Sequence, residues 1–138
     1  MKKNKMAIYA PLLSDLITNT NKVGEEMSHD YEPLEDAVAK NDYAGIDLAK
    51  TKQTFQDGTD QYQGFLVQLQ NADVPAKELG RHSVLTEAYA DYVKGCQDMV
   101  DSISADKIDV EAFNAAGQAQ QDSIERVFKT AQKIMMSM

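Results

Sequence analysis

Apolar side chains recur every three or four residues through almost the whole 138-residue chain. Side chains spaced in this way lie on one face of an α-helix, and steps averaging about 3.5 residues keep that face turned toward a partner helix. Alternation typical of a β-strand does not extend over a useful length. The chain is therefore predicted to be all-α. Four stripes are present, over residues 6–38, 44–69, 82–103 and 113–134.

The breaks between the stripes are short and contain residues that stop and start helices. Asn41 and Asp42 offer a helix stop and a new cap. Asp73 can cap the third helix with Pro75 in its first turn, and Asp109 can cap the fourth. Such short connections force consecutive helices to run antiparallel. We predict one domain over residues 1–138, a single antiparallel up-down-up-down four-helix bundle with helices at about 5–40, 43–71, 75–103 and 109–135.

Pro33 conflicts with the first helix, because a proline inside a helix removes a hydrogen bond and clashes with the carbonyl four residues back. The stripe nevertheless continues through it to Leu34 and Val38, after one extra step of four residues at Tyr31. A break and a kinked continuous helix both fit this pattern. We favour the kink, because the apolar face is not interrupted.

The charge and the chain ends limit the partners and the location. A net charge of −8, from 14 Lys and Arg against 22 Asp and Glu, argues against nucleic acid, because phosphate binding requires a basic face. The Lys-rich start precedes only a short apolar run that Pro11 interrupts, so we expect no signal peptide. No stretch approaches the length of a membrane span. We therefore expect a cytoplasmic protein without a transmembrane segment.

One motif suggests a metal centre. Glu26 and His29 have the Glu-x-x-His spacing of di-iron bundles, which places both side chains on one helix face. A complete centre needs a second copy, but Leu79 stands three residues before His82 in place of a glutamate. Antiparallel packing also places the two histidines roughly 15 Å apart along the bundle. We predict no metal site and no cofactor.

Three tyrosines and one histidine form the most distinctive set of polar side chains on the stripes. All four occupy seam positions, which are the positions of an apolar stripe that should face the other helices: Tyr62, Tyr89, Tyr92 and His82. One interpretation is close packing, in which His82 is a buried neutral imidazole bonded to a threonine or a backbone carbonyl and fixes the register of the bundle. The alternative is an interior site in which these four side chains bind a small ligand.

Two glycines also occupy seam positions. A glycine costs about 1 kcal/mol inside a helix, so each suggests a large side chain opposite. Aligning the antiparallel helices about their connecting turns assigns each residue to a layer of the bundle. In these layers Gly58 should face Tyr89, and Gly117 should face Tyr31 or Tyr92.

Cys96 lies in the middle of the third predicted helix, on an apolar stripe with Tyr92 and Met99. A catalytic cysteine needs a base and a pocket that stabilises an anion. Neither is evident around this position. We expect an unreactive core cysteine that forms no internal disulfide, because the chain has 1 cysteine.

The carboxyl end, residues 134–138, is rich in methionine. Methionine-rich surfaces can bind partners adaptably. Equally, these residues can close the end of the bundle against Met6 and Tyr9, which the topology places nearby.

No phosphate loop, nucleophile elbow or zinc-protease helix is present. We therefore predict a protein without enzymatic activity, an interaction or scaffold module for an unknown protein partner or for self-association. The alternative is a small-ligand sensor or carrier whose interior is lined by tyrosines and His82. An exposed apolar groove would favour the first function, and an elongated internal pocket with converging tyrosines would favour the second.

Overall fold

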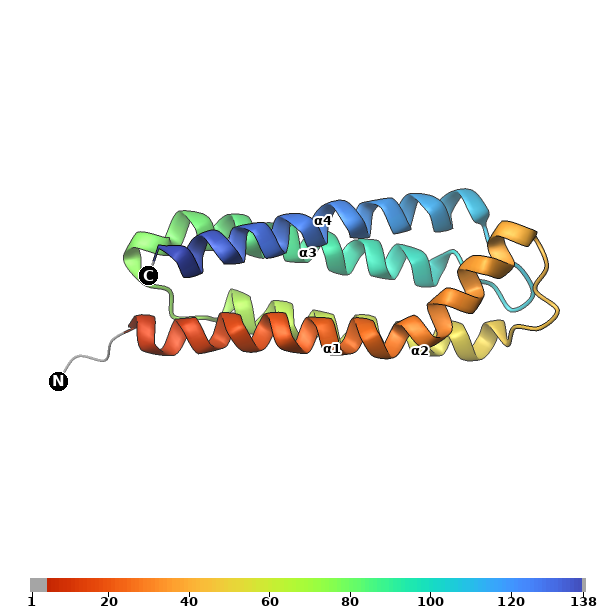
Figure 1. The fold of residues 1–138 in the computed structure, drawn as a ribbon, viewed down its shortest axis with the longest axis horizontal. Coiled ribbons are helices and arrows are strands. Elements are labelled where there is room, and N and C mark those ends of the chain that lie inside the picture. The colour runs from red at the N-terminus through yellow and green to blue at the C-terminus, as the bar shows by residue number, and fades with distance from the viewer. Residues whose placement is uncertain (1–4, 138) are drawn as a thin grey trace.

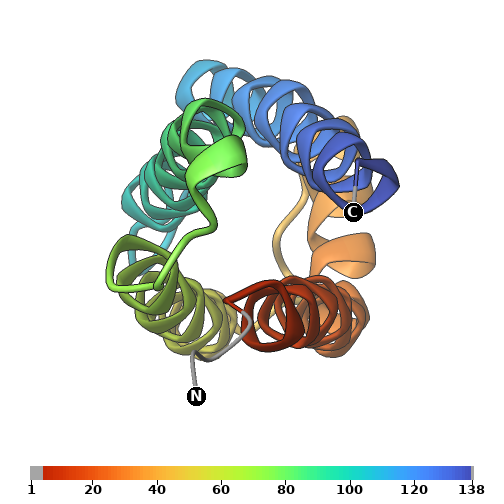
Figure 2. The same cartoon turned by 90° about the vertical axis from the view of Figure 1, so that its left-hand side faces the viewer.

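The structure, a computed structural model, describes residues 5–137. The Lys-rich start, at residues 1–4, and Met138 lie outside the described residues. Consecutive helices run antiparallel and surround a common core in chain order (Figures 1 and 2), which is the predicted all-α four-helix bundle. The described elements are α1 (Lys5–Lys40), α2 (Leu48–Gln70), the short 3-10 helix η1 (Ala76–Glu78), α3 (Leu79–Asp101) and α4 (Val110–Met136).

Helix α1 is continuous through Pro33, which confirms the kink rather than the break. Its last turns, orange in Figure 1, bend away from the line of the first part and cross toward α4. The bend follows from the missing N–H of the proline and the clash of its ring with the preceding turn. The helix ends at Lys40, and Asn41 then adopts a left-handed conformation with φ 51°.

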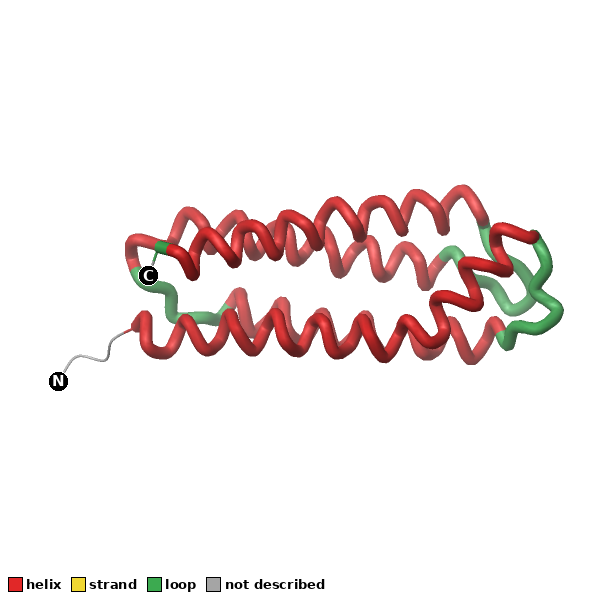
Figure 3. Tube along the Cα trace, viewed as in Figure 1, coloured by secondary structure: helices red, strands yellow, loops and turns green. Residues whose placement is uncertain are grey.

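One predicted helix start and one predicted cap were wrong. The second helix begins at Leu48 rather than near residue 43, because Asp47 supplies the cap and accepts a hydrogen bond from the Lys50 N–H. Asp42 instead accepts from Ala44 within the loop. Asp73 caps nothing and pairs with Lys5 at 3.1 Å, and the third helix starts with η1 after Pro75. Loops are green in Figure 3.

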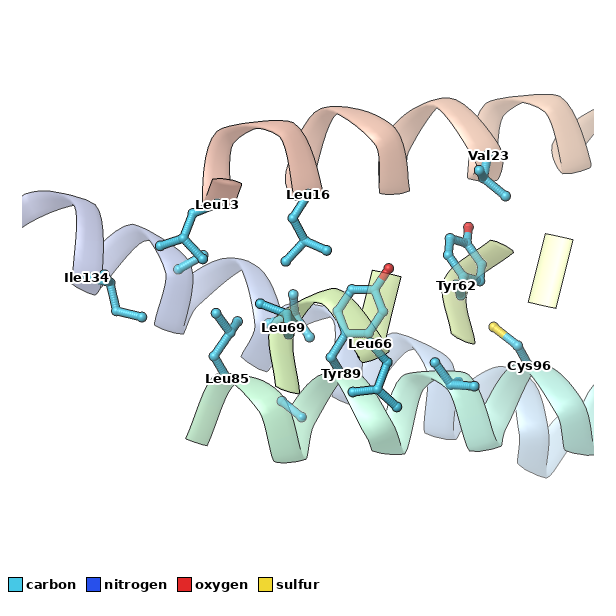
Figure 4. Close-up of a cluster of buried hydrophobic side chains, with 14 of the residues drawn as sticks. Leu13, Leu16, Val23, Tyr62, Leu66, Leu69, Leu85, Tyr89, Cys96 and Ile134 are labelled. Atoms are coloured by element: carbon cyan, nitrogen blue, oxygen red, sulfur yellow. The ribbon is translucent and has the colours of Figure 1, made fainter. Parts of the chain in front are cut away.

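The interior consists of two clusters of buried side chains. The terminal core lies where α1 begins and α4 ends, and several of its members point inward in Figure 4. The kink-side core lies beside the bend of α1. Members of the terminal core are Tyr9, Leu13, Leu16, Val23, Tyr62, Leu66, Leu69, Leu85, Ala88, Tyr89, Val93, Cys96, Val127, Ala131 and Ile134. Members of the kink-side core are Leu34, Leu48, Phe55, Met99, Val100, Ile103, Ile108, Phe113 and Ala116.

Helices α3 and α4 approach each other closely at Gly95. A Cβ atom there would lie 3.1 Å from Gln120 Cγ and 3.3 Å from its backbone nitrogen, so only glycine fits without a shift. The turn between these helices is tight. Ile103 and Ile108 form an antiparallel bridge, and Asp109 caps α4 by accepting from the Ala112 N–H, as predicted.

None of the helices in the described part of the chain combines the length and apolar character needed to cross a membrane.

Candidate functional site

His82, near the start of α3, is buried and uses both ring nitrogens within the protein. Its Nε2 lies 2.9 Å from the Leu69 carbonyl oxygen, and its Nδ1 lies 2.7 Å from the Tyr9 hydroxyl. A carbonyl oxygen only accepts, so Nε2 carries the proton and a neutral ring accepts from Tyr9 at Nδ1. The carbonyl is one of the two partners predicted as alternatives, and the second bond, to Tyr9, was not predicted. The histidine therefore ties α1 to α3 and to the end of α2.

Glu78 forms a second polar link at this end of the bundle. Its side chain is fully buried and accepts hydrogen bonds from the Ser137 hydroxyl and, at 3.0 Å, from the Arg81 guanidinium. The Ser137 hydroxyl and the nearby Arg81 and Lys77 cations hold the pKa of Glu78 below its usual value, against the opposing effect of burial. Glu78 thus joins the start of α3 to the end of α4.

The three predicted tyrosines do come together. The Tyr62 ring centroid lies 5.0 Å from that of Tyr92 and 6.5 Å from that of Tyr89, in edge-to-face contacts. Tyr92 donates to the Tyr62 hydroxyl at 3.3 Å, and Tyr89 bonds Thr20 at 2.8 Å. Burial raises the pKa of Tyr62 to about 12. His82 bonds Tyr9 instead of joining this cluster, so the predicted set of four does not form one site.

A cavity of about 740 Å³ lies between α1 and α4, on the kinked side of the bundle. Its lining comes from residues on both sides of Pro33 in α1, from the first half of α4, and from a few residues of α2 and α3. Of the predicted site residues, Tyr92 lines it. The other lining residues are Gly24, Met27, Ser28, Tyr31, Glu35, Val38, Ala39, Phe55, Thr59, Cys96, Met99, Val110, Phe113, Asn114, Gly117, Gln120, Gln121 and Ile124.

The cavity interrupts the apolar seams. Most seam positions of α1, α3 and α4 are buried, but a group of them stays half-exposed and lines the cavity. Seam residues face a partner helix in a closed bundle; here they face an open space. The half-exposed seam residues that line the cavity are Met27, Tyr31, Val38, Tyr92, Gly117, Gln120 and Ile124.

Aromatic rings and thioethers form much of the wall. The Tyr31 ring stacks on Phe113 with centroids 6.1 Å apart and lies 6.3 Å from Phe55. The Tyr31 hydroxyl donates to Glu35 at 3.1 Å. Burial, followed by the hydrogen bond and the charge of Glu35, raises the pKa of Tyr31 to about 12.

One of the two glycine predictions was wrong. Gly58 faces Met27, whose sulfur would overlap a Cβ atom at this position, and Tyr89 does not lie opposite it. Gly117 faces Tyr31 as predicted, because a Cβ atom there would lie 4.0 Å from the Tyr31 hydroxyl and 3.7 Å from Met99 Cε. The prediction named a side chain of α3, whereas the side chain beside Gly58 comes from α1.

Cys96 lies in the cavity wall and is 5% exposed. Burial raises the pKa of its thiol to about 12, and a hydrogen bond with Tyr92 acts in the opposite direction. The thiolate is the reactive form of cysteine, so this environment suppresses its nucleophilicity.

The Glu-x-x-His motif is on the surface of α1, where Glu26 and His29 are both exposed. Within residues 5–137, no three His, Cys, Asp or Glu side chains gather closely enough to hold a metal ion.

The carboxyl end closes the terminal core. Ile134 is fully buried, and Met135 packs with Met6 against the same cluster that contains Tyr9. Met136 is 78% exposed and is available to a partner.

The chain matches no family model, no curated protein and no solved structure. The description of the site therefore rests on its geometry. That geometry provides an apolar, aromatic-lined cavity with hydroxyl and amide groups, a single cysteine thiol held protonated, and one carboxylate at the edge.

Proposed function

We propose that the protein binds a small, largely apolar molecule in the cavity between α1 and α4. The observation that supports this proposal is the row of seam residues that stays half-exposed there. Apolar surface left open to water costs about 25 cal/mol per Å² relative to burial. An apolar ligand would cover this surface and complete the seam.

The size and the lining of the cavity also support a ligand. A volume of about 740 Å³ falls within the range of roughly 300–1,000 Å³ found for small-molecule sites. Such sites are mainly apolar and aromatic with a few polar groups, which is the composition described above.

We propose binding without catalysis. The raised thiol pKa of Cys96 supports this choice, as does the use of both His82 nitrogens in structural hydrogen bonds. The volume and lining of the cavity favour a sensor or carrier, and because the cavity is open and His82 does not line it, the interaction or scaffold module stays the alternative.

A binding assay with an uncharged fluorescent probe, phenylnaphthylamine, tests the proposal. The wild type should bind it saturably at one site. Gly117→Leu should abolish binding by filling the cavity, because Gly117 lines it and faces Tyr31. Gly64→Leu is the matched control, since Gly64 is an exposed position of α2 with open space around it.

Circular dichroism should show both variants folded, because leucine replaces glycine inside a helix in each case. Absence of saturable binding, or equal binding by Gly117→Leu and wild type, would contradict the proposal. A mass in solution that increases with protein concentration would instead support self-association.

A further inference from the structure

The charged groups around the cavity have one sign. Glu35 is the lone ionisable carboxylate in its lining, and no lysine, arginine or histidine of the described chain lines it. Glu35 is exposed and sits beside the Tyr31 ring. A ligand with a positive charge would meet this carboxylate and the aromatic face, whereas an anion would meet only repulsion.

The hydrogen-bond donors of the lining side chains that are not exposed are occupied within the protein, whereas the exposed amides of Asn114 and Gln121 offer both donors and acceptors. Tyr92 donates to Tyr62 at 3.3 Å, and Tyr31 donates to Glu35 at 3.1 Å. The Gln120 amide nitrogen donates to the Gly95 carbonyl at 3.1 Å and contacts Met99 sulfur at 3.6 Å. Of the Gln120 side chain, the amide oxygen is therefore the group left for a ligand.

The two small hydroxyl residues of the lining follow the same pattern. Ser28 donates to the Glu25 carbonyl at 2.6 Å, and Thr59 donates to the Phe55 carbonyl at 2.7 Å. A hydroxyl group that has used its one hydrogen retains lone pairs that accept. Five lining side chains from α1, α2, α3 and α4 thus offer acceptors rather than donors.

We infer that the ligand is an organic cation, an apolar or aromatic body with a primary ammonium group. The ammonium supplies three donors and a positive charge, which complement the acceptors and the Glu35 carboxylate. The body lies against Tyr31, Phe55 and Phe113. This inference rests on the proposed function, because it names the class of molecule that the same cavity binds.

Competition with compounds of one size tests the inference. Phenylbutylamine, phenylbutanol and phenylbutyrate share an aromatic body and differ in the terminal group. Each should displace bound phenylnaphthylamine, and the amine should bind about fivefold more tightly than the alcohol, as expected for a partly exposed ion pair. Phenylbutyrate should bind most weakly. The trimethylammonium analogue of the amine should bind less tightly than the amine, because it has the charge but no donors.

Variants at Glu35 test whether this carboxylate causes the tighter binding of the amine than of the alcohol. Glu35→Gln keeps an acceptor for Tyr31 and should reduce the amine-to-alcohol ratio to about one. Glu35→Lys should reverse the preference in favour of phenylbutyrate. Glu32→Gln is the matched control, because Glu32 is exposed on the same helix and does not line the cavity.

Methyl resonances of methionine locate the bound amine. Signals of Met27 and Met99, which line the cavity, should shift, and those of Met6 and Met135, which pack at the terminal core, should not. Equal affinities of amine, alcohol and acid, or tighter binding of the acid to wild type, would overturn the inference while leaving the proposed function intact. Failure of phenylnaphthylamine to bind would contradict the proposed function itself.

Discussion

The two cores of the bundle differ in whether their buried polar groups are hydrogen-bonded and in whether a cavity adjoins them. In the terminal core Leu13, Leu69 and Leu85 are fully buried, and the polar groups of Tyr9 and His82 bond each other. On the kink side the Tyr43 hydroxyl is buried and no described residue bonds it. The cavity also lies on this side.

The difference shows what a proline inside a long helix does to a four-helix bundle. From Tyr9 to Val23, α1 follows its neighbours and its seam residues are buried. At Pro33 the helix changes direction, and the seam residues on both sides of the bend line the cavity. One part of the chain thus supplies stability, and the other retains the space that a ligand needs.

Truncation of one aliphatic side chain in the terminal core and one in the cavity wall should show the largest contrast. Leu85→Ala, at a fully buried position of the terminal core, should lower the free energy of unfolding by about 2–5 kcal/mol. Ile124→Ala, at a half-exposed position of the cavity wall, should cost about 1 kcal/mol, because less apolar area leaves the interior. Urea denaturation measures both. Equal losses would mean that the cavity wall is packed as tightly as the terminal core.

Removal of the His82 ring should test the polar link of the terminal core. His82→Leu retains apolar volume but leaves the Tyr9 hydroxyl without a partner, and the Leu69 carbonyl keeps the hydrogen bond from the Ala72 N–H. An unpaired buried hydroxyl is costly, so we expect a loss of about 1–3 kcal/mol. The double variant Tyr9→Phe, His82→Leu should recover part of this loss, as a double-mutant cycle in urea would show. Unchanged stability in His82→Leu would refute the link.

The same tyrosine substitution should have opposite signs in the two regions. Tyr9→Phe leaves His82 Nδ1 unpaired and should cost about 1 kcal/mol. Tyr43→Phe removes a buried hydroxyl that has no described partner and should be neutral or stabilising by up to about 1 kcal/mol. Thermal unfolding of the two variants beside wild type provides the comparison, and a destabilised Tyr43→Phe would place a partner on that hydroxyl.

Acid should weaken the terminal end through Glu78. Because the folded protein lowers the pKa of Glu78, the unfolded chain binds the proton more readily. The resulting stability is fully present above the usual value of 4.5 and is lost as pH falls through the folded pKa. Glu78→Gln should therefore lose this part of the pH dependence, in urea denaturation measured below neutral pH. Parallel pH profiles of wild type and Glu78→Gln would contradict the assignment.

The sequence predicted the fold well because helical periodicity is a repeated signal. Every seam contributed to it, and the stripe across Pro33 indicated the continuous helix. Local capping was predicted less well: Asp42 and Asp47 are both residue types that cap helices, and the one that caps precedes Leu48, which packs in the kink-side core.

The site was predicted in part. The tyrosines were identified because they occupy seams, but a seam pattern does not tell which of its positions remain open. Met27 and Gln120 line the cavity for reasons that depend on the direction of α1 after its bend. One sequence feature indicated where the seam stays open. Pro33, the extra step at Tyr31 and Gly117 fall in the same region of the bundle, where the regular helix spacing is interrupted.

The close approach of α3 and α4 has a consequence for the folding pathway. Their connection is short, the bridge of Ile103 and Ile108 closes it, and Gly95 allows the two backbones to meet. Contacts between segments near in sequence form with little loss of chain entropy and so arise early. We expect the α3–α4 hairpin to be structured in the transition state, with α1, whose N-terminal half reaches α3 and α4 across long sequence separations, docking last. Substitutions in this hairpin should then slow folding, whereas those in α1 should mainly speed unfolding.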